Sequence, residues 1–308
     1  MRIFFLLFAF SLWASPKAEL HLHLSGAFPI DFIQSIATED EFIALQANLD
    51  QISERGLSYH EAFSVFNLVY KIVNTNEKVE EGTAALCREL EEDGVTYAEI
   101  RTGLRNLGGG HERYLQAVLN GAAKSQLQPK ILLSLRRSSS LAVAKETVDL
   151  ALKYGLVGID ISGDSTIGNI ETILPEILRA KEAGLFLTLH IGESPKEEGQ
   201  LECLEILQPD RVGHAVFLQD EAKKWVLERK IPIEMCLTSG VLAGMIAEFS
   251  EHPALDYFAN GHPVVFCTDD PLIFRTCLSK EKKILTELIG ISGAEEMSQK
   301  AFDHVFVK

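Results

Sequence analysis

Two histidines, His21 and His23, are the first residues of the chain whose types and spacing could do chemistry. Residues two apart on a β-strand point to the same side, so both imidazoles could face one divalent metal ion. An H-x-H pair alone is weak evidence, because such pairs are common on surfaces and in cores. Joined by His190 and Asp269, the pair becomes a set of three imidazoles and one carboxylate, which satisfies zinc and leaves room for a water. Zinc lowers the pKa of such a water to about 7, which makes hydroxide available at neutral pH.

Three more polar residues, Glu193, His214 and Asp270, lie at or just after the ends of short apolar segments. Glu193 lies three residues after His190, beyond a turn that contains glycine. We predict that it transfers protons, although a glutamate at a helix N-terminus is the alternative. We predict that His214 positions the hydroxide and stabilises oxyanion charge, and the alternative is a hydrogen-bonded core histidine. Asp269 and Asp270 point in different directions from a strand end, so one can ligate the metal while the other accepts a hydrogen bond from substrate. If Asp269 does not bind metal, Asp270 more simply caps a helix.

Eight apolar segments are predicted to be the strands that position these residues. Most are continuous apolar runs, which is typical of parallel strands buried on both faces, and they alternate with amphipathic helical segments. Eight such units predict an α/β fold, the (β/α)8 TIM barrel, whose active site lies at the carboxyl ends of the strands. The predicted strands are Ala18–His23, Val95–Arg101, Lys130–Leu135, Leu156–Ile161, Leu185–His190, Arg211–Ala215, Ile231–Met235 and Pro263–Cys267. The predicted helices include Glu61–Val73, Glu77–Glu92, Leu141–Lys153, Ile170–Ala183 and Ala222–Lys230.

Glycines and one long connection refine this barrel. Gly94, Gly155 and Gly184 each stand between a helix and the next strand, where a left-handed residue ends a helix. The stretch from Ser25 to Gly94 is too long for one crossover, so we predict extra helices after the first strand.

Composition narrows the class of function. With 308 residues, 46% hydrophobic and 24% charged, the chain is globular and has an ordinary length for one barrel. Its net charge of −15 argues against nucleic acid or an anionic membrane as a partner. The five cysteines contain no C-x-x-C pair, which argues against a disulfide scaffold, and Cys236 and Cys267 are expected to be small core residues. No G-x-S-x-G, G-x-G-x-x-G or Walker A pattern is present.

The N-terminus resembles an export signal. Arg2 is followed by an apolar run from Ile3 to Trp13 and then by Ala14, Ser15 and Pro16. The run is too short to span a bilayer, which takes ~20 residues, so no stable membrane span is expected. We predict a signal over residues 1–15 and one barrel domain over 16–308, with export to the periplasm, or a cytoplasmic protein if residues 1–15 form a buried first element.

Five ordered segments carry a resemblance to a known family. They read PKAELHLHLSGAFP, LHIGE, RVGHAV, EMCLTSG and HPVVFCTDDP, between Pro16 and Leu278. They resemble the adenosine/AMP deaminase family of metal-dependent hydrolases. The segments AFSVFNLVYKIV, YAEIRTG, LLSLRR and LVGIDISGD are more similar to its N6-methyl-AMP deaminase (adenosine deaminase-like) branch.

The resemblance implies a site and a reaction. It implies one Zn²⁺ per chain and hydrolytic loss of the 6-amino group of a purine nucleoside or nucleotide, with ammonia or methylamine released. It implies that Asp270 accepts a hydrogen bond from purine N7 and that the Gly163 backbone lies near N3, and we expect a monomer. The implied metal ligands are His21, His23, His190 and Asp269, with Glu193 as proton shuttle and His214 beside the hydroxide. Residues expected at the substrate are His23, Ser25, Gly163, Asp270, Arg105 and Arg136.

The sugar end of the substrate is where this chain departs from the family pattern. Ser25 stands where relatives usually carry Asp or Asn facing the sugar, and Gly240 replaces the usual Asn of LTSN. A 5′-phosphate would need local cations in so acidic a chain, and arginines at the ends of the second and third strands could supply them. The candidates are Arg101 and Arg105 after the second strand and Arg136 and Arg137 after the third. A structural ion pair is the alternative for each, and Arg105 and Arg136 are the two that we select as substrate-binding residues.

Two other functions compete with deamination. One is another metal-dependent amide or ester hydrolase; binuclear members usually place a carboxylated lysine after the fourth strand, and GIDISGD has none. The other is an exported purine-binding protein without activity, which would have lost at least one catalytic residue.

Overall fold

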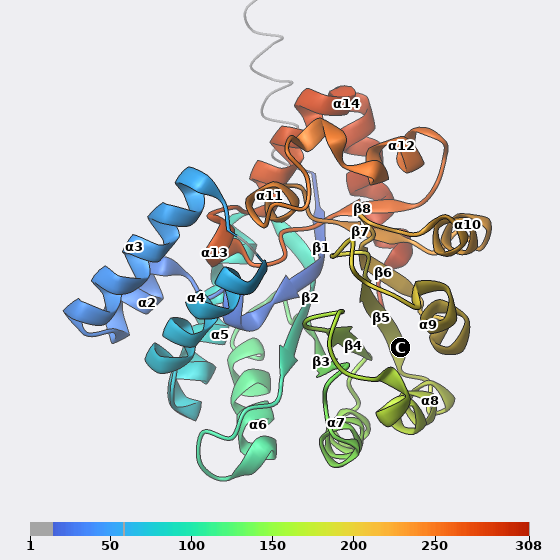
Figure 1. The fold of residues 1–308 in the computed structure, drawn as a ribbon. Coiled ribbons are helices and arrows are strands. Elements are labelled where there is room, and N and C mark those ends of the chain that lie inside the picture. The colour runs from blue at the N-terminus through green and yellow to red at the C-terminus, as the bar shows by residue number, and fades with distance from the viewer. Residues whose placement is uncertain (1–14, 58, 308) are drawn as a thin grey trace, which may run out of the picture.

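The computed structural model describes residues 15–57 and 59–307 and shows an eight-stranded parallel barrel (Figure 1). The strands follow one another in sequence order around the sheet. An isolated bridge between Leu22 on β1 and Asp269, just after the last strand, closes the barrel, and the Asp269 amide donates to the His21 carbonyl at 2.8 Å. The predicted (β/α)8 fold is confirmed. The strands are β1 Lys17–His23, β2 Val95–Gly103, β3 Lys130–Arg136, β4 Gly158–Ser162, β5 Phe186–Ile191, β6 Arg211–His214, β7 Ile233–Met235 and β8 Val264–Phe266.

Helices follow the strands and surround the barrel (Figure 1). The predicted helix Ile170–Ala183 is wrong as one element: it divides into a 3₁₀ turn, Ile170–Thr172, and α8, because Pro175 lacks an amide donor and starts a new helix. Gly94, Gly155 and Gly184 have φ of 78°, 62° and 80°, as predicted for residues that end helices. The barrel helices are α5 Asn76–Glu92, α6 Gly110–Ala122, α7 Leu141–Lys153, α8 Leu174–Glu182, α9 Gln200–Leu207, α10 Asp220–Glu228, α11 Leu237–Leu242, α12 Pro253–Ala259, α13 Pro271–Phe274 and α14 Leu278–Lys300.

The connection from β1 to β2 carries the predicted extra helices, α2 Ile30–Ile36, α3 Glu39–Arg55 and α4 Tyr59–Ile72, ahead of α5. Helix α3 begins with a capping box between Thr38 and Glu41. These helices project from one side of the barrel (Figure 1). The end of α3 is tied back to α11, because the Leu57 amide donates to the Leu242 carbonyl at 2.6 Å.

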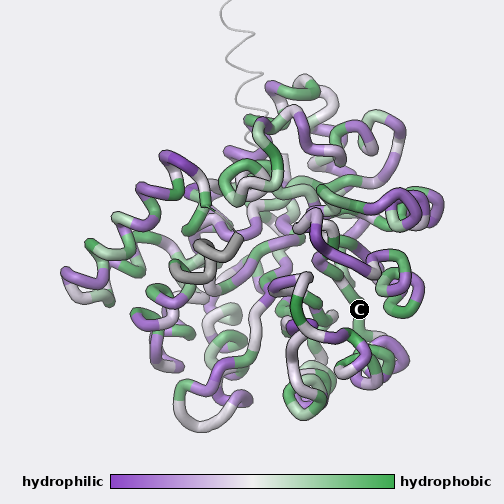
Figure 2. Tube along the Cα trace, viewed as in Figure 1, coloured by the Kyte–Doolittle hydropathy of each residue, from purple (hydrophilic) through white to green (hydrophobic). Residues whose placement is uncertain are grey.

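Hydrophobic packing lies between the strands and the helices, whereas charged side chains cross the barrel interior. The helices alternate between hydrophobic and hydrophilic residues (Figure 2), which lets each bury one face. Inside the barrel, Arg101 on β2 donates to Asp160 on β4 and to Glu234 on β7, at 3.2 and 3.0 Å. Arg211 on β6 donates to the same Glu234 at 2.7 Å. All four are fully or almost fully buried, so each charge depends on its partners.

Among the described residues, no helix combines the length and apolar character needed to cross a membrane. The predicted export signal falls, apart from Ser15, on residues outside those described, and it stays a prediction.

Candidate metal centre and active site

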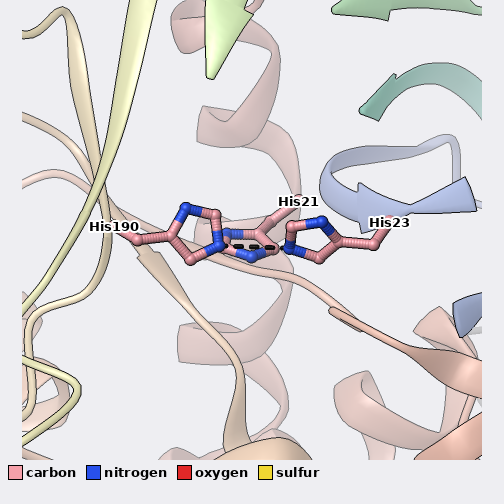
Figure 3. A group of neighbouring side chains, drawn as sticks. All are labelled: His21, His23 and His190. Atoms are coloured by element: carbon pink, nitrogen blue, oxygen red, sulfur yellow. Dashed lines mark hydrogen bonds between the residues drawn. The ribbon is translucent and has the colours of Figure 1, made fainter. Parts of the chain in front are cut away.

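Three histidines from two strands converge at the carboxyl end of the barrel (Figure 3). His21 and His23 come from β1 and His190 from β5, so sequence-distant residues become neighbours. The Nε2 atoms of His23 and His190 lie 3.1 Å apart, and one ring nitrogen from each histidine lies within 4.8 Å of the other two. His21 and His190 are almost fully buried and His23 is partly exposed toward the cavity.

Asp269 joins this cluster from the segment after β8. Its Oδ1 lies 3.4 Å from His21 Nε2 and 3.5 Å from His23 Nε2, while its Oδ2 accepts from the Ser239 hydroxyl. Its φ of 65° is a left-handed conformation that a non-glycine residue adopts at a cost, and such strain is concentrated at functional sites. Burial alone would raise the pKa of Asp269, but His21 and the other histidines hold it well below its usual range. The Asp269 carboxyl group is therefore ionised, and its negative charge faces the histidines.

Two buried carboxylates contact the Nδ1 atoms of His21 and His190, the ring nitrogens that face away from the centre. Glu234 Oε2 lies 2.7 Å from His21 Nδ1, and Asp160 Oδ1 lies 3.0 Å from His190 Nδ1. Each contact places the proton on Nδ1 and leaves the Nε2 lone pair free toward the centre. Arg101 lies between both carboxylates and fixes them.

For Arg101 the structural ion pair that the sequence left as an alternative is the observed role, whereas sequence reasoning missed the supports Asp160, Glu234 and Ser239. The available signal was a charged residue inside a short apolar strand, as in AEIRT, GIDIS and PIEMC. Such a residue is buried on both sides and must have a partner.

These donors fit a divalent cation. His21 Nε2 is fully buried and has no hydrogen-bond partner among the described residues, which is costly unless a further group satisfies it. Three imidazole nitrogens with one ionised carboxylate match the ligand preference of zinc. His214 also lies within reach, because its ring nitrogen groups with those of His21 and an Asp269 oxygen.

Glu193 and His214 lie beside the cluster that His21, His23, His190 and Asp269 form. Glu193 Oε1 is 3.5 Å from His214 Nε2, while Oε2 is buried without a partner. Burial raises the pKa of Glu193 to about 7, where a carboxyl group can both give and take a proton. Burial lowers the pKa of His214 well below its usual value, so its ring is neutral. His214 has a left-handed φ of 61°, which turns its ring into the site.

Asp270 is buried and faces the cavity instead of capping a helix. It stands before the first residue of α13, but its side chain makes no capping bond, and Oδ1 has no partner. Burial and the adjacent Asp269 raise its pKa well above the usual value. A Cβ on Gly26 would lie 1.7 Å from this Oδ1, so only glycine leaves room for the carboxyl group there.

A cavity of about 630 Å³ opens above these groups. Ser25 lines it and lies 3.4 Å from the Tyr70 hydroxyl. Gly163, with φ of 86°, and the two favoured arginines also line it. Arg105 stacks 4.4 Å from the Tyr70 ring centre and donates to two backbone carbonyls, whereas Arg136 is exposed beside Gly163.

The structure separates the four candidate arginines. Arg101 belongs to the buried support described above, and Arg137 forms a buried ion pair with Glu197 at 2.6 Å. Both are occupied by structural pairs, so Arg105 and Arg136 are left as cations at the cavity. Gly240 lies within α11 and does not line the cavity; its neighbour Ser239 does.

The chain is similar to proteins of known sequence and known structure along almost its whole length. The sequence model of the family described as adenosine deaminase matches residues 16–306. N6-methyl-AMP deaminase of Homo sapiens is 29% identical, over 94% of this chain and 88% of its own length, and that of Danio rerio is 31% identical, over 94% and 90%. The Arabidopsis ADAL structures complexed with GMP and with IMP each have a TM-score of 0.86 at 29% identity and cover 97% of this chain and 94% of their own.

Proposed function

Since the chain belongs to the adenosine deaminase family and is a purine-deaminating hydrolase, we propose that its substrates are AMP-type nucleotides, N6-methyl-AMP among them, and that its metal is zinc. The observation that carries the proposal is the buried histidine–aspartate cluster at the floor of a cavity whose rim holds Arg105 and Arg136. The relatives named N6-methyl-AMP deaminase and the related structures with GMP and IMP support a nucleotide substrate.

His21, His23, His190 and Asp269 would hold the cation. When bound, the cation would supply the Lewis acidity that makes hydroxide available from water at neutral pH. These residues would supply one carboxylate charge and three imidazole nitrogens to the cation.

Glu193 moves the proton. Its unpartnered Oε2 accepts a proton from the attacking water and can return it to the purine ring, because a pKa of about 7 suits both directions. His214, neutral and 3.5 Å from Glu193, can donate a hydrogen bond to the oxygen that develops negative charge at C6. The proton of the new C6 hydroxyl then passes to the 6-amino or 6-methylamino nitrogen, the C6–N bond breaks, and ammonia or methylamine leaves an inosine-type product with a C6 carbonyl.

Asp270 orients the purine. Its raised pKa keeps a proton on the carboxyl group of the free protein, so it would donate to N7 of a neutral purine. Transfer of this proton toward N7 during attack would make Asp270 the acceptor, as the sequence predicts. In both states one shared proton joins Asp270 and N7.

Arg105 and Arg136 bind the 5′-phosphate in this proposal. Arginine and phosphate form charge-assisted, often bidentate hydrogen bonds, and the chain offers these two cations at the rim despite its charge of −15. Ser25 and Tyr70 present neutral hydroxyls near this end, so neither repels an anion.

A substrate panel tests the proposal. Adenosine, deoxyadenosine, AMP and N6-methyl-AMP are compared by kcat/KM, with ammonia and methylamine both measured. We expect the nucleotides to exceed their nucleosides and methylamine to be released from N6-methyl-AMP. A preference for adenosine would contradict the nucleotide assignment and favour an adenosine deaminase.

We also propose that residues 1–15 are removed on export. The mass of the protein purified after expression should lack about 15 residues, the usual minimum for such signals. An intact N-terminus would contradict this proposal.

A further inference from the structure

Glu281 is a buried carboxyl group with no cationic partner among the described residues, and its burial raises its pKa. It lies in the first turn of α14, is 0% exposed, and forms no ion pair with any lysine, arginine or histidine in the described part of the chain. Such a group is costly to bury unless hydrogen bonds replace its hydration. Its oxygens accept from the Thr238 amide at 3.2 Å and from the hydroxyls of Thr238 and Thr276. All three donors come from outside the turn that carries Glu281.

Thr238 links Glu281 to the metal-ligand cluster through α11. The residue before α11, Cys236, makes no side-chain capping bond, so the first amides of this short helix have no local acceptor. Glu281 supplies that acceptor from α14. The next residue after Thr238 is Ser239, whose hydroxyl donates to Asp269 Oδ2.

Thr276 links Glu281 to the segment that follows β8. Its amide donates to the Pro271 carbonyl at 3.2 Å, and Pro271 directly follows Asp270. One side chain therefore joins the connection after β7 to the connection after β8, and each connection carries a residue of the centre.

We propose that Glu281 is a positioning residue that holds α11 against the segment after β8, at the spacing where Ser239 reaches Asp269 Oδ2 and Oδ1 faces the histidines. The inference rests on the proposed metal-dependent function. It assigns to α14 an effect on metal retention through Ser239 and Asp269, although α14 supplies none of the proposed ligands.

The test measures how fast the metal leaves for an excess of chelator, without substrate. Glu281→Leu should release metal roughly 10–100-fold faster, as is usual when a group supporting a ligand is removed. Glu281→Gln should stay near the wild type, because its amide oxygen can accept from the Thr238 amide while its NH₂ donates to the hydroxyl oxygens. Ser239→Ala should resemble Glu281→Leu.

The double variant tests whether Glu281 affects metal release through Ser239. If Glu281 acts through Ser239, then Glu281→Leu with Ser239→Ala should release metal no faster than the quicker single variant. Multiplied effects, or an unchanged release rate in Glu281→Leu, would contradict the inference. Should Glu281→Leu fail to fold, Thr238→Val tests the same link from the other side, with the same expected direction.

Leu285→Ala is the matched control for damage to α14. Leu285 is fully buried on the same helix, and its side chain has no polar atom that could bond to Thr238 or Thr276. The variant should therefore lower the unfolding temperature without speeding the release of metal. If Leu285→Ala and Glu281→Leu lower the unfolding temperature equally and also release metal equally fast, Glu281 has only a general structural role. A wild-type protein that binds no metal would instead contradict the proposed function itself, and metal content is therefore measured first.

Discussion

The metal centre and the cavity rim occupy the same end of the barrel but are built in opposite ways. At the centre, His21 and His190 each have a buried carboxylate behind them, and Arg101 fixes both carboxylates. At the rim, Arg136 is exposed and its guanidinium has no hydrogen bond or ion pair with the described residues. The centre is therefore set by the fold before any ligand arrives. At the rim, Arg105 is already held by two backbone carbonyls, whereas Arg136 depends on the ligand for its geometry.

This difference separates chemistry from substrate choice. A rigid, desolvated centre favours the transition state because its dipoles need no reorganisation. A hydrated cation at the rim gives less energy but distinguishes ligands that carry a phosphate from ligands that do not. Changes at the centre should then affect all substrates alike, and changes at the rim should affect nucleotides only.

Glu193→Gln should give the largest loss. The amide is nearly isosteric but cannot transfer a proton, so kcat should fall toward the upper end of ~10²–10⁴-fold for AMP and adenosine alike. Metal content and unfolding temperature should stay at the wild-type values. A variant that retains more than a tenth of the rate with its metal intact would show that Glu193 does not move the proton.

Glu234→Gln should be the most damaging change among the supports. It leaves Arg101 and Arg211 without the full counter-charge they have in the interior, and breaking a buried pair costs about 3–5 kcal/mol of unfolding free energy. It also loosens His21, so metal affinity should fall roughly 10–100-fold. Denaturant unfolding and chelator competition measure the two effects.

The matched control is Glu228→Gln, which makes the same change in an exposed ion pair with Lys224. It should alter the unfolding free energy by less than about 1 kcal/mol. Equal destabilisation at both positions would contradict the idea that the interior network supports the centre.

Asp270→Ala should have an intermediate effect. It removes the hydrogen bond to N7, and a bond of this kind to a charged group is worth about 1.5–3 kcal/mol, or roughly 10–100-fold in kcat/KM. Metal should stay bound, since Asp270 is not one of the proposed ligands, forms no hydrogen bond or ion pair with a histidine in the described part of the chain, and has an Oδ1 without a partner. Unchanged kcat/KM for every purine substrate would show that Asp270 does not bind the substrate.

Arg136→Ala should give the smallest and most selective effect. An exposed guanidinium is screened, so kcat/KM for N6-methyl-AMP should fall about tenfold, and that for its nucleoside should hardly change. Arg113→Ala, an exposed arginine on α6 outside the cavity lining, serves as control. Equal losses for nucleotide and nucleoside would mean that Arg136 does not bind phosphate.

The sequence predicts the strands and the inward histidines well, because both follow from local patterns. All eight strands occur within two residues of their predicted bounds, since continuous apolar runs between glycines leave few alternatives. The roles of Arg101 and Glu234 could not be predicted, because their pairing crosses the barrel and joins strands far apart in sequence. The same holds for Glu281, whose partners lie in two other connections. Local sequence patterns identify the candidate ligands, and only the closed barrel shows which residues hold them in place.

The most direct test of a single-metal hydrolytic centre is titration of metal-free protein with Zn²⁺ while methylamine release from N6-methyl-AMP is followed. Activity should be absent without metal and should rise linearly to its maximum at one equivalent per chain, because three histidines and Asp269 form one set of ligands. Full activity in the metal-free protein, or a maximum reached only at two equivalents, would contradict the account.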